Sequence, residues 1–185
     1  MPRVVENQLG KYNTDPLFKQ LRAQSEIRYT GYCNCSQEER RIRFCTDCYE
    51  GNTKIGFLRN GVNLPLCFPK APDSQYTTAE YVDFIREPGK VFLLAPLIFN
   101  GVCVKFYGWL DVEALRGFGC LEFDEKSAQI EDEFLRETLK RKYGSLEAAS
   151  AIKAFDGLYF SPSEVPPRSS CIYDCRRVTN NRYSV

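Results

Sequence analysis

The chain has 185 residues, 25 basic against 24 acidic side chains, and no histidine. A formal net charge of +1 argues against a surface that neutralises many phosphates, since such a surface needs a concentrated positive face. The absence of histidine excludes the Ser-His-Asp and Cys-His nucleophile arrangements and the commonest nitrogen ligand of catalytic zinc.

The number of cysteines and the hydropathy of the chain indicate the cellular compartment in which the protein is expected. The nine cysteines form an odd set, and the start MPRVV carries no apolar signal region. No apolar run approaches the ~20 residues of a membrane span. The sequence therefore predicts reduced thiols in a cytosolic or nuclear protein that has no contact with membranes.

The first third of the chain predicts a helix, a strand and a second helix. Asp15 caps a short helix whose first turn holds a proline, and residues 26–32 alternate as a strand does. Ser36 and Glu39 form a capping box, in which each side chain is placed to bond the other residue's backbone amide. The second helix is expected to end near Gly51.

From residue 53 the apolar period changes to two, which predicts antiparallel strands. Two Asn-Gly pairs, Asn60-Gly61 and Asn100-Gly101, are typical of hairpin tips because both residues tolerate positive φ. Pro65 lacks an amide donor and predicts an edge strand or a bulge. The expected strands are 53–57, 64–68, 81–85, 91–99, 102–110 and 120–123, with a helical turn at 112–116.

The last third predicts helices and a tail. Asp124 is placed to cap a helix that runs to about Lys142 and ends at Gly144, and Ser145 begins a shorter one. We expect a folded domain over 1–142, a helical extension over 143–160 and a disordered, flexible tail over 161–185. Helices, then antiparallel strands, then helices indicate an α+β fold with a partly open antiparallel β-barrel flanked by helices.

Two sets of side chains leave other functions open. Cys33, Cys35, Cys45 and Cys48 form C-x-C-x9-C-x2-C, and four thiolates suit tetrahedral zinc, so a zinc-stabilised protein-interaction adaptor is an alternative function. The competing interpretation is that Cys45 and Cys48 pack beneath their helix.

The second set is aromatic, and it raises the possibility of a single-strand binder. Phe106, Tyr107 and Trp109 are adjacent strand residues of the kind that stack on bases in an OB-like protein, although core packing is expected for at least two of them. The chain has neither a G-x-G-x-x-G sequence nor a P-loop, and no cofactor is expected.

Several segments, taken in order, resemble the core-binding factor beta subunit family. They are MPRVV, EIRYTGY, EERRIRF, the hairpin around GVNL, and above all NGVCVKFYGWLD with GCLEFDE, spanning Met1 to Asp132. The resemblance implies a partly open antiparallel barrel flanked by helices. It also implies a non-enzymatic transcriptional co-factor that forms a heterodimer with a Runt-domain transcription factor, contacts no DNA and allosterically raises the partner's DNA affinity. The expected location is the nucleus, with a cytoplasmic pool.

The resemblance also implies a partner-binding site. Gly61 and Asn100 match partner-binding positions of the family, whereas hairpin geometry alone would make both simple turn residues. The other expected contacts are Asn63, Leu64, Cys67, Gly101 and, in the matched start, Arg3. The chain departs from the family at Cys33, Cys35, Cys45, Pro65 and Cys67.

Overall fold

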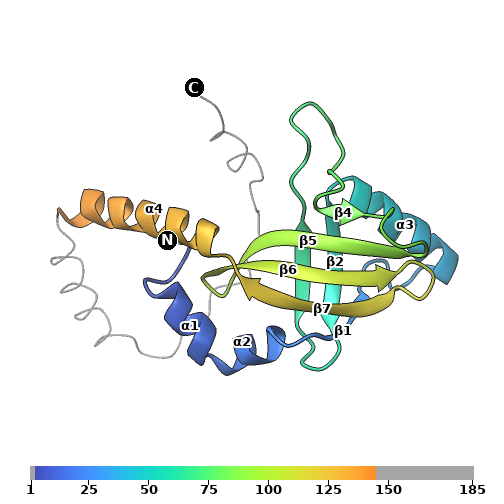
Figure 1. Ribbon diagram of the computed structural model, residues 1–185, viewed down its shortest axis with the longest axis horizontal. Helices are drawn as coiled ribbons and strands as arrows, with labels where there is room; N and C mark the ends of the chain where they lie inside the picture. Colours follow the sequence, from blue (N-terminus) through green and yellow to red (C-terminus); the bar gives the residue numbers. More distant parts are fainter. Residues whose placement is uncertain (1–2, 145–185) are drawn as a thin grey trace.

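A computed structural model describes residues 3–144 (Figure 1). One antiparallel sheet of seven strands, in the order β3-β2-β1-β7-β6-β5-β4, forms the body of this part of the chain. The predicted α+β fold, with a curled sheet, flanking helices and a C-terminal helix, is confirmed. The elements are α1 Gln8–Thr14, α2 Pro16–Leu21, β1 Ser25–Tyr29, α3 Gln37–Tyr49, β2 Asn52–Phe57, β3 Asn63–Cys67, β4 Val82–Asp83, β5 Lys90–Phe99, β6 Val102–Asp111, β7 Arg116–Phe123 and α4 Glu125–Tyr143.

The curl of the sheet encloses the main core. Alternation places one face of each strand inward, and the row Phe57, Ile27, Gly117, Leu110 and Val91, aligned across five strands, is buried throughout. The two sheet edges, β3 and β4, are not paired with each other, but β3 packs against β5. In Figure 1, α1, α2 and α4 gather at one end of the long strands and α3 lies at the other.

The helix starts follow from capping chemistry, with one difference from the prediction. The Asp15 carboxylate accepts a hydrogen bond from the Leu17 amide at 2.8 Å, and the Ser36 hydroxyl accepts one from the Glu39 amide at 3.2 Å. The Glu39 carboxylate does not complete the capping box, because it pairs with Arg43 one turn later in α3. An ion pair at i,i+4 therefore replaces the reciprocal bond.

Two strands have limits that differ from those predicted. β4 is short because the Asp83 carboxylate accepts hydrogen bonds from the Ile85 and Arg86 amides, which turns the chain away from β5. β7 is longer than predicted and begins at Arg116. Glycine is depleted from strands in general, so the presence of Gly117 argued against a strand at this position, and the sequence prediction missed the first residues of β7. The position nevertheless requires glycine, because a Cβ there would lie 1.8 Å from the Trp109 carbonyl oxygen.

A second, smaller core lies outside the curl, where α4 and the N-terminal segment cover β6. It consists of Val4, Cys103, Ala128, Leu135 and Leu139. The helix α1, which the sequence did not predict, is capped by Asn7 and directs Gln8 into this core.

Gln8 joins three elements. Its Nε2 donates to the Ala128 carbonyl at 3.2 Å and to the Asp132 carboxylate at 2.7 Å, and its Oε1 accepts from the Cys103 amide at 2.8 Å. The side chain is 2% exposed. A single buried amide therefore fixes α1 against β6 and α4.

Replacing Gln8 with leucine should destabilise the chain by about 2 kcal/mol, because the buried Cys103 amide would lose its acceptor. Chemical denaturation measures this difference. Gln20→Leu is the matched control, since Gln20 is an exposed glutamine of α2. Equal midpoints for the two variants would contradict the role assigned to Gln8.

The last described helix, α4, ends at the predicted residue. Gly144 has φ +76 and its amide bonds the Lys140 carbonyl, so it ends α4. The expected helix from Ser145, the rest of the 143–160 extension and the 161–185 tail lie outside the described residues. Within residues 3–144, no helix combines the length and apolarity that crossing a bilayer requires.

Candidate partner-binding surface

The β5–β6 turn is a tight hairpin tip, as predicted. Asn100 has φ +47 and Gly101 has φ +79, the pair of positive values that a type I′ turn requires. The N-terminal segment holds this tip from one side: the Val5 amide donates to the Gly101 carbonyl at 2.9 Å, and Lys11 Nζ donates to the Asn100 carbonyl at 2.7 Å. A Cβ at Gly101 would lie 3.0 Å from a Val5 methyl carbon, so glycine also permits this close approach.

The side chain of Asn100 is left available. It is exposed, and within residues 3–144 its amide forms no hydrogen bond. A side-chain amide both donates and accepts, so it can pair with the backbone of another polypeptide. The Asn100 backbone, with its positive φ and its carbonyl bonded to Lys11, directs this amide away from the turn.

The β2–β3 turn is wider than the predicted two-residue tip. Only Gly61, at φ +71, has positive φ, and its amide bonds the Phe57 carbonyl at 3.0 Å. The Asn60 side chain accepts from the Val62 amide at 3.1 Å, which explains why asparagine precedes the glycine. A Cβ at Gly61 would meet nothing within 4 Å. The space in front of Gly61 is therefore open.

The strand β3 follows this turn and forms one edge of the sheet, as Pro65 predicted. Asn63 is exposed and Cys67 half-buried, and both face outward with Pro65. Leu64 points the other way and is 2% exposed. Its side chain therefore belongs to the core, and the expected role as an apolar anchor does not fit its position.

Strand direction relates the two turns. The ladder β2, β1, β7, β6, β5 is antiparallel at every step, so β2 and β5 run the same way and the two turns point in the same direction. The register aligns Phe57, at the end of β2, with Val91, near the start of β5, so the β5–β6 turn extends beyond the β2–β3 turn along the strand direction. In a flat sheet the four strand spacings between β2 and β5 would amount to ~19 Å. The curl that packs β3 against β5 shortens this path.

The expected contact Arg3 lies in the N-terminal segment that borders the β5–β6 turn. Its guanidinium is 3.6 Å from the Glu131 carboxylate of α4. Sequence reasoning missed the neighbouring Val5 and Lys11, which hold the turn through contacts of long sequence separation that leave no local pattern.

The zinc alternative is wrong for this part of the chain. The Cys33 thiol is exposed and donates to the Thr30 carbonyl, whereas Cys48 is fully buried in the core. No group of three or more metal-ligating side chains occurs among residues 3–144.

The aromatic residues of β6 also differ from the expectation. Phe106 is buried, but Tyr107 is 36% exposed and Trp109 faces outward, so only one of the three packs in the core. Lys90 Nζ lies 4.5 Å from the centre of the Trp109 ring and covers it. An occupied ring is a poor stacking platform for a base.

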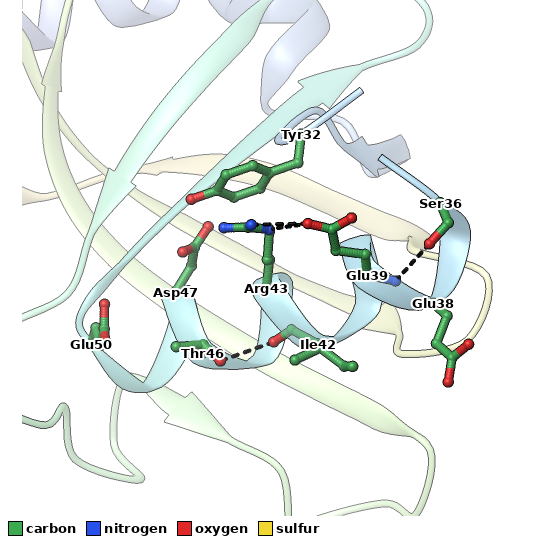
Figure 2. A pocket seen from close by; sticks show the side chains of 9 residues that line it. All are labelled: Tyr32, Ser36, Glu38, Glu39, Ile42, Arg43, Thr46, Asp47 and Glu50. Carbon is green, nitrogen blue, oxygen red and sulfur yellow. Dashed lines mark hydrogen bonds and ion pairs between the residues drawn. The ribbon is translucent and has the colours of Figure 1, made fainter. Parts of the chain in front are cut away.

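A groove runs along α3, and several of its polar groups have partners nearby (Figure 2). Arg43 lies between the Tyr32 ring, 4.5 Å from its centre, and the Glu39 carboxylate at 2.9 Å. Asp47 accepts from the Tyr29 hydroxyl at 2.9 Å, and desolvation raises the pKa of its carboxyl group. These contacts stabilise α3 against β1, and we assign no chemistry to the groove.

Comparison with known proteins identifies the family. The core binding factor beta subunit family model matches residues 1–151, which extends the match past Asp132. The chain is 48% identical to Protein big brother of Drosophila melanogaster over 141 residues, 76% of this chain and 66% of that protein. It is also 48% identical to Protein brother of the same organism over 140 residues, 76% of this chain and 65% of that protein. The match thus spans just under two thirds of either relative. The chain belongs to the core binding factor beta subunit family.

Proposed function

We propose that this chain is the non-DNA-binding subunit of a heterodimeric transcription factor. It binds a Runt domain and raises that domain's affinity for DNA without contacting DNA itself. The observation that carries the proposal is the family match over residues 1–151. The proposed role is non-enzymatic, and the proposed site of action is the nucleus, with a cytoplasmic pool.

The charge of the chain supports a role in which the Runt domain, and not this chain, contacts DNA. With 25 basic and 24 acidic residues, the chain has no excess of positive charge for a phosphate backbone. The proposed contact surface consists instead of the Gly61 turn, the Asn100-Gly101 turn and the outward side chains of Asn63 and Cys67. Arg3 is placed at its margin. These groups suit close contact with another polypeptide backbone.

Population shift is the proposed mechanism. If a free Runt domain samples several loop arrangements and only one binds DNA, a subunit that binds this arrangement removes the conformational penalty. Couplings between two sites are usually about 1–3 kcal/mol, which corresponds to roughly 5- to 150-fold in affinity.

Fluorescence anisotropy of a labelled Runt-site duplex tests the proposal. The full chain alone should leave the anisotropy unchanged at low salt. A Runt domain should bind the duplex, and saturating amounts of the chain should then lower the Kd for DNA by roughly 5- to 150-fold. Direct binding of the chain to the duplex, or an unchanged Kd in its presence, would refute the proposal.

A further inference from the structure

A cleft of about 620 Å³ lies where the end of β1, the start of α3 and the start of β7 meet. Arg28, Arg40 and Arg116 line it, together with neutral side chains that include Gln37 and Asn63. No carboxylate is among its lining residues. We propose that this cleft binds a phosphorylated side chain of another polypeptide.

The two strand arginines are neighbours across a ladder. Arg28 of β1 and Arg116 of β7 are register partners, and both side chains are exposed on the outer face of the sheet. Like charges directly opposite each other destabilise an antiparallel pair. Within residues 3–144 neither guanidinium forms an ion pair. The fold therefore keeps two adjacent positive charges without an internal anion.

Within residues 3–144, no neighbouring carboxylate forms an ion pair with an arginine of the cleft. Asp111 is the register partner of Arg116 on β6, but its Oδ1 accepts the amides of Glu113 and Ala114 at 2.9 and 2.7 Å. The Glu113 carboxylate pairs with Arg41. Glu26 shares the outer face of β1 but does not line the cleft.

The third arginine is already oriented. Arg40 of α3 donates from Nη2 to the Tyr29 carbonyl at 2.8 Å and from Nε to the Gly31 carbonyl at 3.2 Å. Its guanidinium also lies 5.6 Å from the centre of the Tyr29 ring. Arginine has five N–H donors, so these two bonds leave others for a ligand. Holding the group in place beforehand reduces the entropy lost on binding.

Phosphate suits this arrangement better than other anions do. A phosphate monoester carries about −1.5 to −2 charge at pH 7 and offers three acceptor oxygens, which matches three guanidinium groups. A carboxylate has one charge and two oxygens and would leave part of the cleft unpaired. A nucleic acid needs a basic stripe rather than one cleft. Asn63 belongs both to the cleft and to the proposed Runt-binding surface, so the assignment is tested on the free chain, without a Runt partner.

Titration of the full chain with N-acetyl-phosphoserine amide, followed by proton–nitrogen NMR of backbone and arginine Nε–H signals, tests the assignment. Saturable shifts should appear at Thr30, Ala114 and the three arginines. Arg28→Gln and Arg116→Gln should each weaken binding about tenfold, as expected for one lost charge-assisted hydrogen bond. Arg136→Gln is the matched control, because Arg136 is an exposed arginine of α4 without an ion pair in the described part of the chain.

Each probe and each variant in this experiment gives a result that either supports or overturns the assignment. The unphosphorylated serine probe should not bind, and N-acetyl-glutamate amide should bind more weakly than the phosphorylated probe. Equal binding of the glutamate probe, tighter binding of a short single-stranded oligonucleotide, or equal losses in Arg136→Gln and the cleft variants would overturn the assignment. Thermal midpoints of the three variants should agree within about 3 °C, which separates lost binding from lost folding.

Discussion

Asn100→Gly should weaken binding of a Runt domain by about 10- to 100-fold while the thermal midpoint of the free chain stays nearly constant. The substitution removes an exposed amide that has no hydrogen bond within the described part of the chain. Glycine is the right replacement, because Asn100 has φ +47 and an alanine there would add backbone strain. Isothermal titration calorimetry measures the affinity, and differential scanning fluorimetry measures the midpoint.

Gly61→Asn tests the second turn of the proposed surface. Asparagine tolerates the φ of +71, and the space around Gly61 is empty in the free chain, so the fold should accept the side chain. A closely approaching partner backbone would not, and binding should fall by about tenfold or more. Gly89→Asn is the control, since Gly89 also has positive φ and open space but belongs to neither of the two turns. Equal losses at both glycines, or no loss at Gly61, would contradict the proposed surface.

The fold was predictable where the signal is local. The Asn100-Gly101 tip, the Asp15 and Ser36 caps and the edge position of Pro65 each follow from the preferences of one or two residues. The features that the sequence did not predict depend on contacts between residues far apart in the chain. The helix α1 is joined to β6 and α4 by Gln8, a polar residue whose partners lie about 95 to 124 residues away.

The same distinction applies to the proposed partner site. Turn chemistry located Gly61 and Asn100 as exposed tips, and family resemblance gave them a role. Neither could indicate that Lys11 fixes the Asn100 carbonyl across 89 residues. Likewise, alternation alone does not say which face of β6 is inward, and the register with β7 places Phe106 inside and Trp109 outside. Long-range register decides the side chains that local pattern leaves ambiguous.

Gly117→Ala should destabilise the chain by about 3 kcal/mol, near the upper end of typical overpacking costs. The added methyl carbon would lie 1.8 Å from the Trp109 carbonyl oxygen, which belongs to backbone and cannot rotate away. The strands β6 and β7 would have to separate. Gly89→Ala adds the same methyl group to open space and should cost only about 1 kcal/mol, through its positive φ. Denaturation with urea compares the two, and a smaller loss at Gly117 would contradict the clash.

This substitution also connects packing with function. In strand order, β7 joins the β1–β2–β3 part of the sheet, which carries the Gly61 turn, to the β5–β6 hairpin, which carries Asn100. Moving β7 away from β6 therefore changes the separation of the two turns. If both contact one Runt domain, Gly117→Ala should weaken binding even at temperatures where the variant remains folded. Unchanged affinity in the folded variant would indicate that one turn suffices for binding.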